Sequence, residues 1–199
     1  MTAALRIRPF VPQDRDEVIA LVLHCQNDGT RPPVTAADQP ELLHIPEQYQ
    51  AAGGEFWIAR DGDRLAGCIG LLLCSDGAGI LKKFFVYEPY RGAPHHLGQQ
   101  LYRVLLDCAR ARGVRQLFLD TPKNTGRAHR FYQKAGFRPI TQAEMPVQYR
   151  LIYEENDFFC LDLQRNTAIL FPMRKQDGCF VIWRRYAPRG GRPDRRPPP

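Results

Sequence analysis

The sequence predicts an α/β (α+β) fold in which helices flank a mixed central sheet whose N-terminal strands are antiparallel. Two patterns support this prediction. Between residues 55 and 87, apolar runs of strand length alternate with turns such as Asp61-Gly62-Asp63, which is typical of hairpins. Beyond residue 95, stretches with helical spacing alternate with short apolar runs, which is typical of strand–helix units. The 199 residues are enough for one such domain with a substantial core.

The N-terminal part is predicted to form a strand, a helix and an irregular connection. Residues 5–9 alternate between apolar and charged side chains, as in a strand with one buried face. Residues 14–27 have the apolar spacing of an amphipathic helix. The Pro-rich residues 31–40 form a connection, and residues 41–52 are expected to form a second helix with an irregularity at Pro46. This region is a natural place for a lid on the substrate side.

Three consecutive antiparallel strands are expected next, and helices alternate with strands after them. The strands of the first group are Phe56–Ala59, Leu65–Cys74 and Ile80–Tyr87. The later elements are a helix from about Leu97 to Arg112, a strand at Gln116–Leu119, a helix at Thr125–Ala135, a strand from Phe137 and a last strand within Asp157–Leu163. Gly113 and Gly136 follow the two helices, and a glycine in the left-handed conformation commonly ends a helix.

The formal net charge of +7 belongs to the C-terminal tail. Residues 164–199 hold 9 of the 28 Lys+Arg and 2 of the 21 Asp+Glu, so residues 1–163 are electrically balanced. We divide the chain into a globular domain (1–163), an extension compatible with an extra hairpin (164–186) and a basic Pro/Gly/Arg-rich tail expected to be disordered (187–199). A solubilising tail explains this composition better than nucleic-acid binding does, although aromatic and basic residues are mixed at 183–186.

The six cysteines form no CxxC pair and most lie in apolar stretches, as small core residues do. The N-terminus does not resemble a leader, and no apolar run approaches the roughly 20 residues of a membrane-spanning helix. We therefore expect a soluble, cytoplasmic protein without a membrane partner. The sequence does not decide between a monomer and a homodimer.

The strongest functional signal begins at the apolar strand Leu81–Val86. It is followed by Tyr90-Arg91-Gly92 and by a helix that starts near Leu97-Gly98. Main-chain amides of such a turn and the positive end of the helix can hold phosphate oxygens, and Arg91 can pair with a phosphate. The alternative is an ordinary capped loop in which Gly92 serves only the turn.

The second signal is the segment Arg130–Phe137 (RFYQKAGF). Structure alone explains most of it, because Phe131 suits the apolar face of a helix, Gly136 suits its end and Phe137 begins a buried strand. Structure does not require the hydroxyl of Tyr132. A tyrosine beside a thioester sulfur can donate a proton to the departing thiolate.

In combination, LKKFFV, YRG with LGQQL, ARARG, LFLD and AHRFYQKAGF resemble the GNAT superfamily of acyl-CoA-dependent N-acetyltransferases, over residues 5 to 163. The resemblance implies acetyl-CoA as cosubstrate and Tyr132 as the catalytic acid that faces the thioester. It also implies which residues bind the cosubstrate. Phe85, Val86 and Asn124 would contact the pantetheine arm, and the pyrophosphate would be bound by Arg91, Gly92, Leu97, Gly98 and Gln99. Asn124 stands next to Thr125, which replaces an asparagine of many relatives.

The phosphate loop departs from the pattern of that family. The stretch from Arg91 to Gly98 is two residues longer than usual, so Pro94 or His96 stands where a loop glycine is expected. Proline has no amide proton to donate. We interpret His95 and His96 as exposed loop residues rather than catalytic ones.

The expected activity is direct transfer of an acetyl group from acetyl-CoA to a primary amine, without a metal or an enzyme nucleophile. A small-molecule acceptor is expected, and a protein amine is the alternative. A non-catalytic acyl-CoA-binding regulatory module is a further alternative, because the central strand offers Lys82 and Lys83 where some relatives carry a glutamate. A main-chain amide near Val86 would polarise the carbonyl. The candidate general bases, acting through water, are Glu55, Glu88, Asp120 and Glu144.

Overall fold

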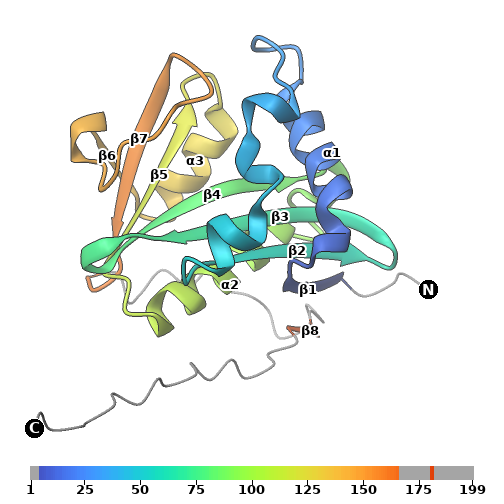
Figure 1. Cartoon of the computed structure of the whole chain (residues 1–199), viewed down its shortest axis with the longest axis horizontal. Coiled ribbons are helices and arrows are strands. Elements are labelled where there is room, and N and C mark those ends of the chain that lie inside the picture. The colour runs from blue at the N-terminus through green and yellow to red at the C-terminus, as the bar shows by residue number, and fades with distance from the viewer. Residues whose placement is uncertain (1–4, 166–179, 182–199) are drawn as a thin grey trace, which may run out of the picture.

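The computed structural model describes residues 5–165 and 180–181. Within them, eight strands form one mixed sheet in the order β6-β7-β5-β4-β3-β2-β1-β8 (Figure 1). The strands are β1 (Leu5–Pro9), β2 (Glu55–Asp61), β3 (Arg64–Leu73), β4 (Ala78–Val86), β5 (Gln116–Pro122), β6 (Arg138–Ile140), β7 (Asn156–Asp162) and β8 (Phe180–Val181). The α-helices are α1 (Arg15–Gln26), α2 (Leu97–Ala111) and α3 (Gly126–Lys134).

The first four strands pair antiparallel in sequence order. This confirms the three consecutive antiparallel strands predicted between residues 56 and 87, to which the structure adds β1. Gly62, with a φ of 56°, closes the β2–β3 hairpin in the left-handed conformation that favours glycine. After β4 the sheet becomes mixed, because β5 runs parallel to β4 while β7 pairs antiparallel with β5 and β6. The predicted α/β class with a mixed sheet is therefore confirmed.

Two irregularities of β4 position the functional site. Cys68 pairs with Phe85 and Gly70 with Lys82, so Lys83 and Phe84 stand opposite a single residue of β3 in a β-bulge. Lys83 adopts a φ of 51° there. In addition, β4 pairs with β5 only from Ala78 to Ile80. The two strands part beyond this point, and the edge of β4 turned towards β5 is left without a partner strand.

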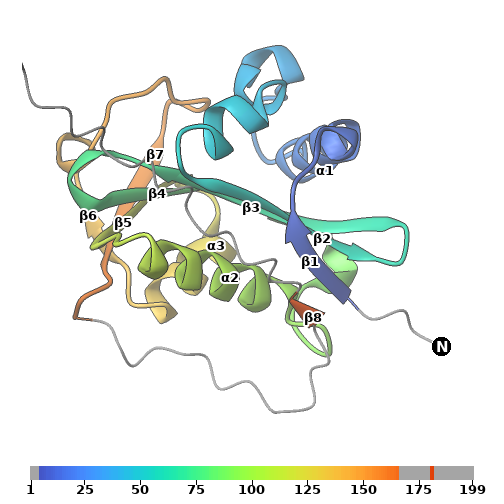
Figure 2. The same cartoon turned by 60° about the horizontal axis from the view of Figure 1, so that its bottom comes forward.

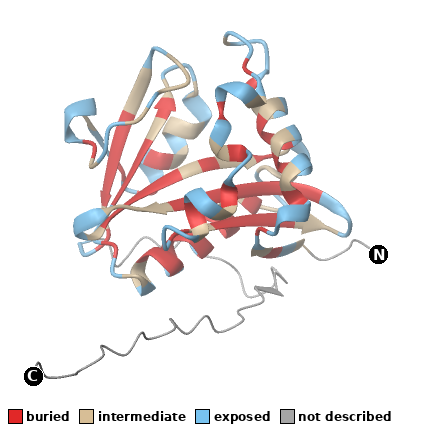
Figure 3. Ribbon diagram, viewed as in Figure 1, coloured by how far each residue is buried: buried red, intermediate tan, exposed pale blue. Residues whose placement is uncertain are grey.

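Helices cover both faces of the sheet (Figure 2). Helix α1 and the turns that follow it lie on one face, whereas α2 and α3 lie on the other. We call these the α1 face and the α2/α3 face. Each face buries its own apolar cluster: Val18, Leu21, Leu42 and Tyr49 belong to the first, and Leu101, Leu105 and Phe137 to the second. Figure 3 shows the buried residues concentrated along the central strands and on the helix sides turned towards them.

The predicted helix over residues 41–52 is wrong. The chain forms a 3-10 turn, η3 (Pro40–Leu42), and then a short π-helical turn, η4 (Pro46–Gln50). Pro46 lacks an amide proton and its ring obstructs the carbonyl one turn earlier, so a continuous α-helix cannot run through it. The pattern located the irregularity but overestimated the regular helix around it.

The predicted hairpin over residues 164–186 lies mostly outside the described residues, which include only β8, paired parallel with β1. The tail 187–199 lies wholly outside them. In the part of the chain that the structure describes, no helix has the length and apolar character needed to cross a bilayer.

Candidate active site

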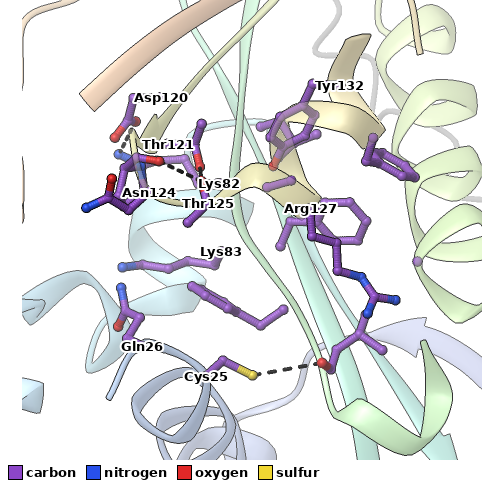
Figure 4. Close-up of a pocket in the computed structure, with 18 of the residues that line it drawn as sticks. Cys25, Gln26, Lys82, Lys83, Asp120, Thr121, Asn124, Thr125, Arg127 and Tyr132 are labelled. Carbon is purple, nitrogen blue, oxygen red and sulfur yellow. Dashed lines mark hydrogen bonds and ion pairs between the residues drawn. The ribbon is translucent and has the colours of Figure 1, made fainter. Parts of the chain in front are cut away.

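A cavity of about 600 Å³ opens where β4 and β5 part. Its lining comes from both faces of the sheet: α1, η3 and the segment before β7 contribute from one face, and the start of α2 and α3 from the other. Figure 4 shows Gln26 and Lys83 on one side of the cavity and Tyr132 and Arg127 on the opposite side. The strand gap therefore connects two differently built half-sites.

The N-terminus of α2 forms one wall of the cavity, to which Gly92, His96, Gly98 and Gln99 contribute. The loop is held closed by the amide of His96, which donates to the carbonyl of Gly92 at 2.6 Å. Leu97 does not line the cavity, because its side chain is fully buried in the core of the α2/α3 face. In the first turn of α2, the amides of Gln99 and Gln100 donate to the carbonyl of His96 at 2.9 and 3.3 Å. The amides of Leu97 and Gly98 are left without an intrahelical acceptor, and such amides suit an anion.

The guanidinium of Arg91 lines the same wall but already has three partners. Nε donates to the carbonyl of Val86 at 2.6 Å, Nη1 pairs with Glu88 at 2.6 Å, and Nη2 lies 3.5 Å from Sγ of Cys25. Arg91 therefore ties the loop to the end of β4. Any phosphate contact of Arg91 competes with these bonds.

Arg127, in the first turn of α3, also lines the cavity and is exposed. It forms no salt bridge within the described residues, and its side chain extends along the α2/α3 side of the cavity in Figure 4. Sequence reasoning did not single it out, because an arginine near the start of a helix carries no distinctive pattern. Asn124 and Thr125, just before α3, line the cavity as well.

Tyr132 is 6% exposed and is held by a cluster of aromatic rings. The ring centroids of Phe131 and Phe137 lie 5.8 and 5.6 Å from its own. Its hydroxyl points into the cavity (Figure 4). Burial raises the pKa of this hydroxyl, and the carboxylate of Asp120 raises the pKa further. The group is therefore protonated at neutral pH, as a proton donor must be.

The bulge in β4 turns two consecutive lysines towards groups on the α1 face. Nζ of Lys82 lies 3.6 Å from Oδ1 of Asp120 and 3.6 Å from the centre of the Tyr149 ring. The Tyr149 hydroxyl donates to the same carboxylate at 2.5 Å. Asp120 lines the cavity within this cluster.

Lys83 joins the bulge to the turns after α1. Its Nζ pairs with Glu41 at 2.8 Å and donates to Oε1 of Gln39, whose amide in turn donates to Gln26 at 2.7 Å. Burial lowers the pKa of the Lys83 ammonium, and Glu41 opposes this effect. Sequence reasoning missed this network. The signal was the pair Lys82-Lys83 inside an apolar strand, since regular alternation cannot place both residues on one face.

The other predicted site residues divide clearly. Phe85 and Val86 line the cavity together with Asp120. The remaining three candidate bases do not line it: Glu55 accepts from Gln50, Glu88 pairs with Arg91, and Glu144 caps a turn at Thr141. His95 and His96 are half-buried rather than exposed: His95 packs beside the ring of Tyr90, whereas His96 is the N-cap residue of α2 and lines the cavity.

The model of the acetyltransferase (GNAT) family matches residues 19–137, which is more than half of the chain. The chain belongs to the GNAT family. The matched segment includes β4, α2 and Tyr132, so the resemblance that the sequence motifs indicated is confirmed.

Individual proteins agree with this assignment. The structure resembles an acetyltransferase from Streptococcus agalactiae (32% identity, TM-score 0.75), with 80% of this chain and 98% of that chain covered. A putative acetyltransferase from Salmonella typhimurium, with acetyl-CoA as its cofactor, has the same fold at 19% identity (TM-score 0.62; 83% and 97% covered). Human N-acetyltransferase 8 is 26% identical over 116 residues, which are 56% of this chain and 51% of that protein. The chain thus spans about half the length of the curated relatives that it matches.

Proposed function

We propose that this GNAT-family chain transfers the acetyl group of acetyl-CoA directly to a primary amine of a small molecule. One observation carries the proposal. The cavity joins the two faces of the sheet through the gap between β4 and β5, with Tyr132 on one side and a carboxylate, Asp120, in the polar cluster with Lys82. Two substrates that enter from opposite faces would meet in this gap.

The α2/α3 side fits acetyl-CoA. The unpaired edge of β4 offers main-chain groups to the amides of a pantetheine arm, much as a missing strand would. The first turn of α2, with Gly98 and Gln99, suits a pyrophosphate. Arg127 adds a cation without a salt bridge among the described residues. The Salmonella typhimurium neighbour, with acetyl-CoA as its cofactor, supports the same assignment independently.

In the proposed reaction the amine nitrogen bonds to the acetyl carbon while the carbon–sulfur bond breaks. Tyr132 donates its hydroxyl proton to the departing sulfur and regains a proton from solvent. Asp120 accepts the proton that the amine loses, directly or through one water. Asp120 is favoured because it alone among the four candidate carboxylates lines the cavity.

The first experiment measures binding and turnover separately. Calorimetry should show 1:1 binding of acetyl-CoA, and a spectrophotometric assay of thiol release should then find an accepted amine in a screen of small molecules and peptides. Absence of binding would overturn the proposed cosubstrate. Binding without turnover on any amine would favour a regulatory acyl-CoA-binding module, and turnover on peptides alone would favour a protein acceptor.

We further propose that residues 1–163 form the catalytic unit and that it acts in a reducing compartment such as the cytoplasm. The support is that the family match and the strands β1 to β7 lie within that range, whereas β8 alone of the described strands lies beyond it. In addition, the five cysteines among the described residues are all free thiols.

A further inference from the structure

Several cavity-lining residues on the α1 face have polar atoms that lack a hydrogen-bond partner within the described chain. These atoms are Nε of Arg31, the hydroxyl of Tyr153 and Oδ1 of Asn156, and all three are buried. A buried polar group without a partner is costly, so such groups are commonly completed by a ligand or a water. Their position in one cavity indicates that a polar ligand is recognised there.

Arg31 is held in place before any ligand arrives. Its Nη2 pairs with Asp28 at 3.2 Å, and Asp28 is itself fixed by the amide and hydroxyl of Thr30 at 3.0 and 2.5 Å. Its guanidinium lies over the ring of Tyr153, 5.4 Å from the centroid. The loop after α1 thereby meets the segment before β7 at the cavity. A fixed, planar guanidinium is well suited to a carboxylate.

The charges of the lining favour an anion over a second cation. Each of the three carboxylates that line the cavity is already paired: Asp28 with Arg31, Glu41 with Lys83 and Asp120 with Lys82. By contrast, Arg150 lines the cavity without a salt bridge in the described part of the chain. The second cation of a dicationic acceptor would therefore have no unpaired carboxylate to bind. A carboxylate could bind Arg150 and the unpartnered Nε of Arg31.

We infer that the amine acceptor carries a carboxylate, which Arg31 and the Tyr153 hydroxyl bind, so that Arg31 determines acceptor specificity. The inference rests on the proposed acetyl transfer and adds the chemical class of its acceptor. Asn156 gives the acceptor its orientation. Its Nδ2 donates to Oδ2 of Asp120 at 3.4 Å, which holds the amide group beside the proposed base and leaves Oδ1 as an acceptor for the amine.

The test compares acceptors that differ only in the carboxylate: leucine, leucinamide and isopentylamine, and likewise phenylalanine, phenylalaninamide and phenethylamine. The wild-type protein should show a kcat/KM about 10- to 100-fold higher for the free acid than for either analogue, as expected for charge-assisted hydrogen bonds. In Arg31→Gln this ratio should fall to within about threefold of one, and Arg31→Lys should restore part of it. Arg103→Gln, an exposed residue of α2 that does not line the cavity, is the matched control and should keep the ratio.

A wild-type preference for the amide or the decarboxylated amine would overturn the inference, and so would an equal loss for all three acceptors in a folded Arg31→Gln. Circular dichroism and a calorimetric titration with acetyl-CoA establish that the variants fold.

Failure of the proposed function has a separate signature. If no amine in the wider screen is acetylated, the site is judged by binding alone, with N-acetylleucine and N-acetylleucinamide titrated into the protein in the presence of CoA. Tighter binding of the acid by the wild-type protein, lost in Arg31→Gln, would still support the carboxylate site. Equal binding, or none, would overturn it.

Discussion

The two faces of the sheet build their halves of the cavity in different ways. The α2/α3 face uses regular helices, and its contributions are a helix N-terminus, the buried hydroxyl of Tyr132 and the exposed Arg127. The α1 face uses short turns around η3 and η4, fixed by side-chain pairs such as Lys83–Glu41 and Arg31–Asp28. Under the proposed function, cosubstrate binding would follow from the fold, whereas acceptor choice would follow from individual side-chain contacts.

The largest effect is expected from Tyr132→Phe on the α2/α3 face. Without a proton donor for the departing sulfur, kcat should fall by about 10²- to 10³-fold, while the Kd of acetyl-CoA should change less than about threefold. Tyr102→Phe is the matched control, because Tyr102 lies in the same core and its buried hydroxyl also lacks a partner among the described residues. Stopped-flow or steady-state thiol release measures both variants. A Tyr132→Phe variant with wild-type kcat would remove Tyr132 from the reaction.

Asp120→Asn tests whether the base belongs to the cluster around Lys82. We expect kcat/KM to fall by about 10- to 100-fold, because the amide of asparagine cannot accept the proton that the amine loses. Tyr149→Phe keeps the carboxylate and removes one of its partners, so its effect should be several-fold smaller. If the two variants were equally impaired, Asp120 would act only as part of the packing.

Lys83→Met tests whether the α1 face can be altered without affecting the other face. It leaves Glu41 and Gln39 without their buried partner, so the acceptor KM should rise about 10-fold while the Kd of acetyl-CoA stays within about twofold. Stability should fall by about 1–2 kcal/mol, since one partner is partly exposed. If the acceptor KM and the Kd of acetyl-CoA rose together, a change on the α1 face would also affect the α2/α3 face, contrary to this expectation.

The burial of Lys83 also predicts that the stability of the wild-type protein depends on pH differently from that of Lys83→Met. Burial lowers the pKa of Lys83 in the folded state below the 10.5 of an unperturbed lysine. At pH values between the lowered pKa and 10.5, the unfolded chain therefore binds more protons than the folded chain. The free energy of unfolding of the wild-type protein should therefore rise with pH through this window, relative to Lys83→Met. Urea titrations at pH 8 and 10 measure this difference. An identical change in the two proteins would contradict it.

The smallest effect is expected from Arg127→Gln. The exposed guanidinium should contribute one screened phosphate contact, so the Kd of acetyl-CoA should rise about fivefold at low salt and less at high salt. The acceptor KM should be unaffected. Arg130→Gln, exposed on the same helix and absent from the cavity lining, is the control, and titrations at two salt concentrations distinguish the variants.

The sequence allowed good prediction of the α2/α3 face because that face depends on local patterns. The apolar periodicity of residues 97–112 located α2, and Gly113 and Gly136, with φ values of 74° and 86°, end their helices as expected. Tyr132 and the loop near Gly98 could be placed at one site because a parallel strand and its helices bring them together.

The α1 face could not be predicted in the same way. Its contacts join residues far apart in the chain, such as Lys83 with Gln39 and Arg31 with Tyr153, and no local pattern encodes them. The turns η3 and η4 follow from Pro40 and Pro46, but the direction of their side chains depends on tertiary packing. The bulge at Lys83 was readable in principle, since two adjacent lysines break the alternation of an otherwise apolar strand.

That bulge adds one residue to β4 without changing the side of the sheet to which its neighbours belong. Removing Lys83 from the chain would leave Phe84 opposite Ile69 and restore a continuous ladder from Gly67 to Leu73. A chain shortened by this residue would thus have a straighter central strand, while Lys82 would lose its lysine neighbour. The contacts of Lys83 with Glu41 and Gln39 therefore depend on one inserted residue, and its loss would leave a complete sheet without this link to the turns that follow α1.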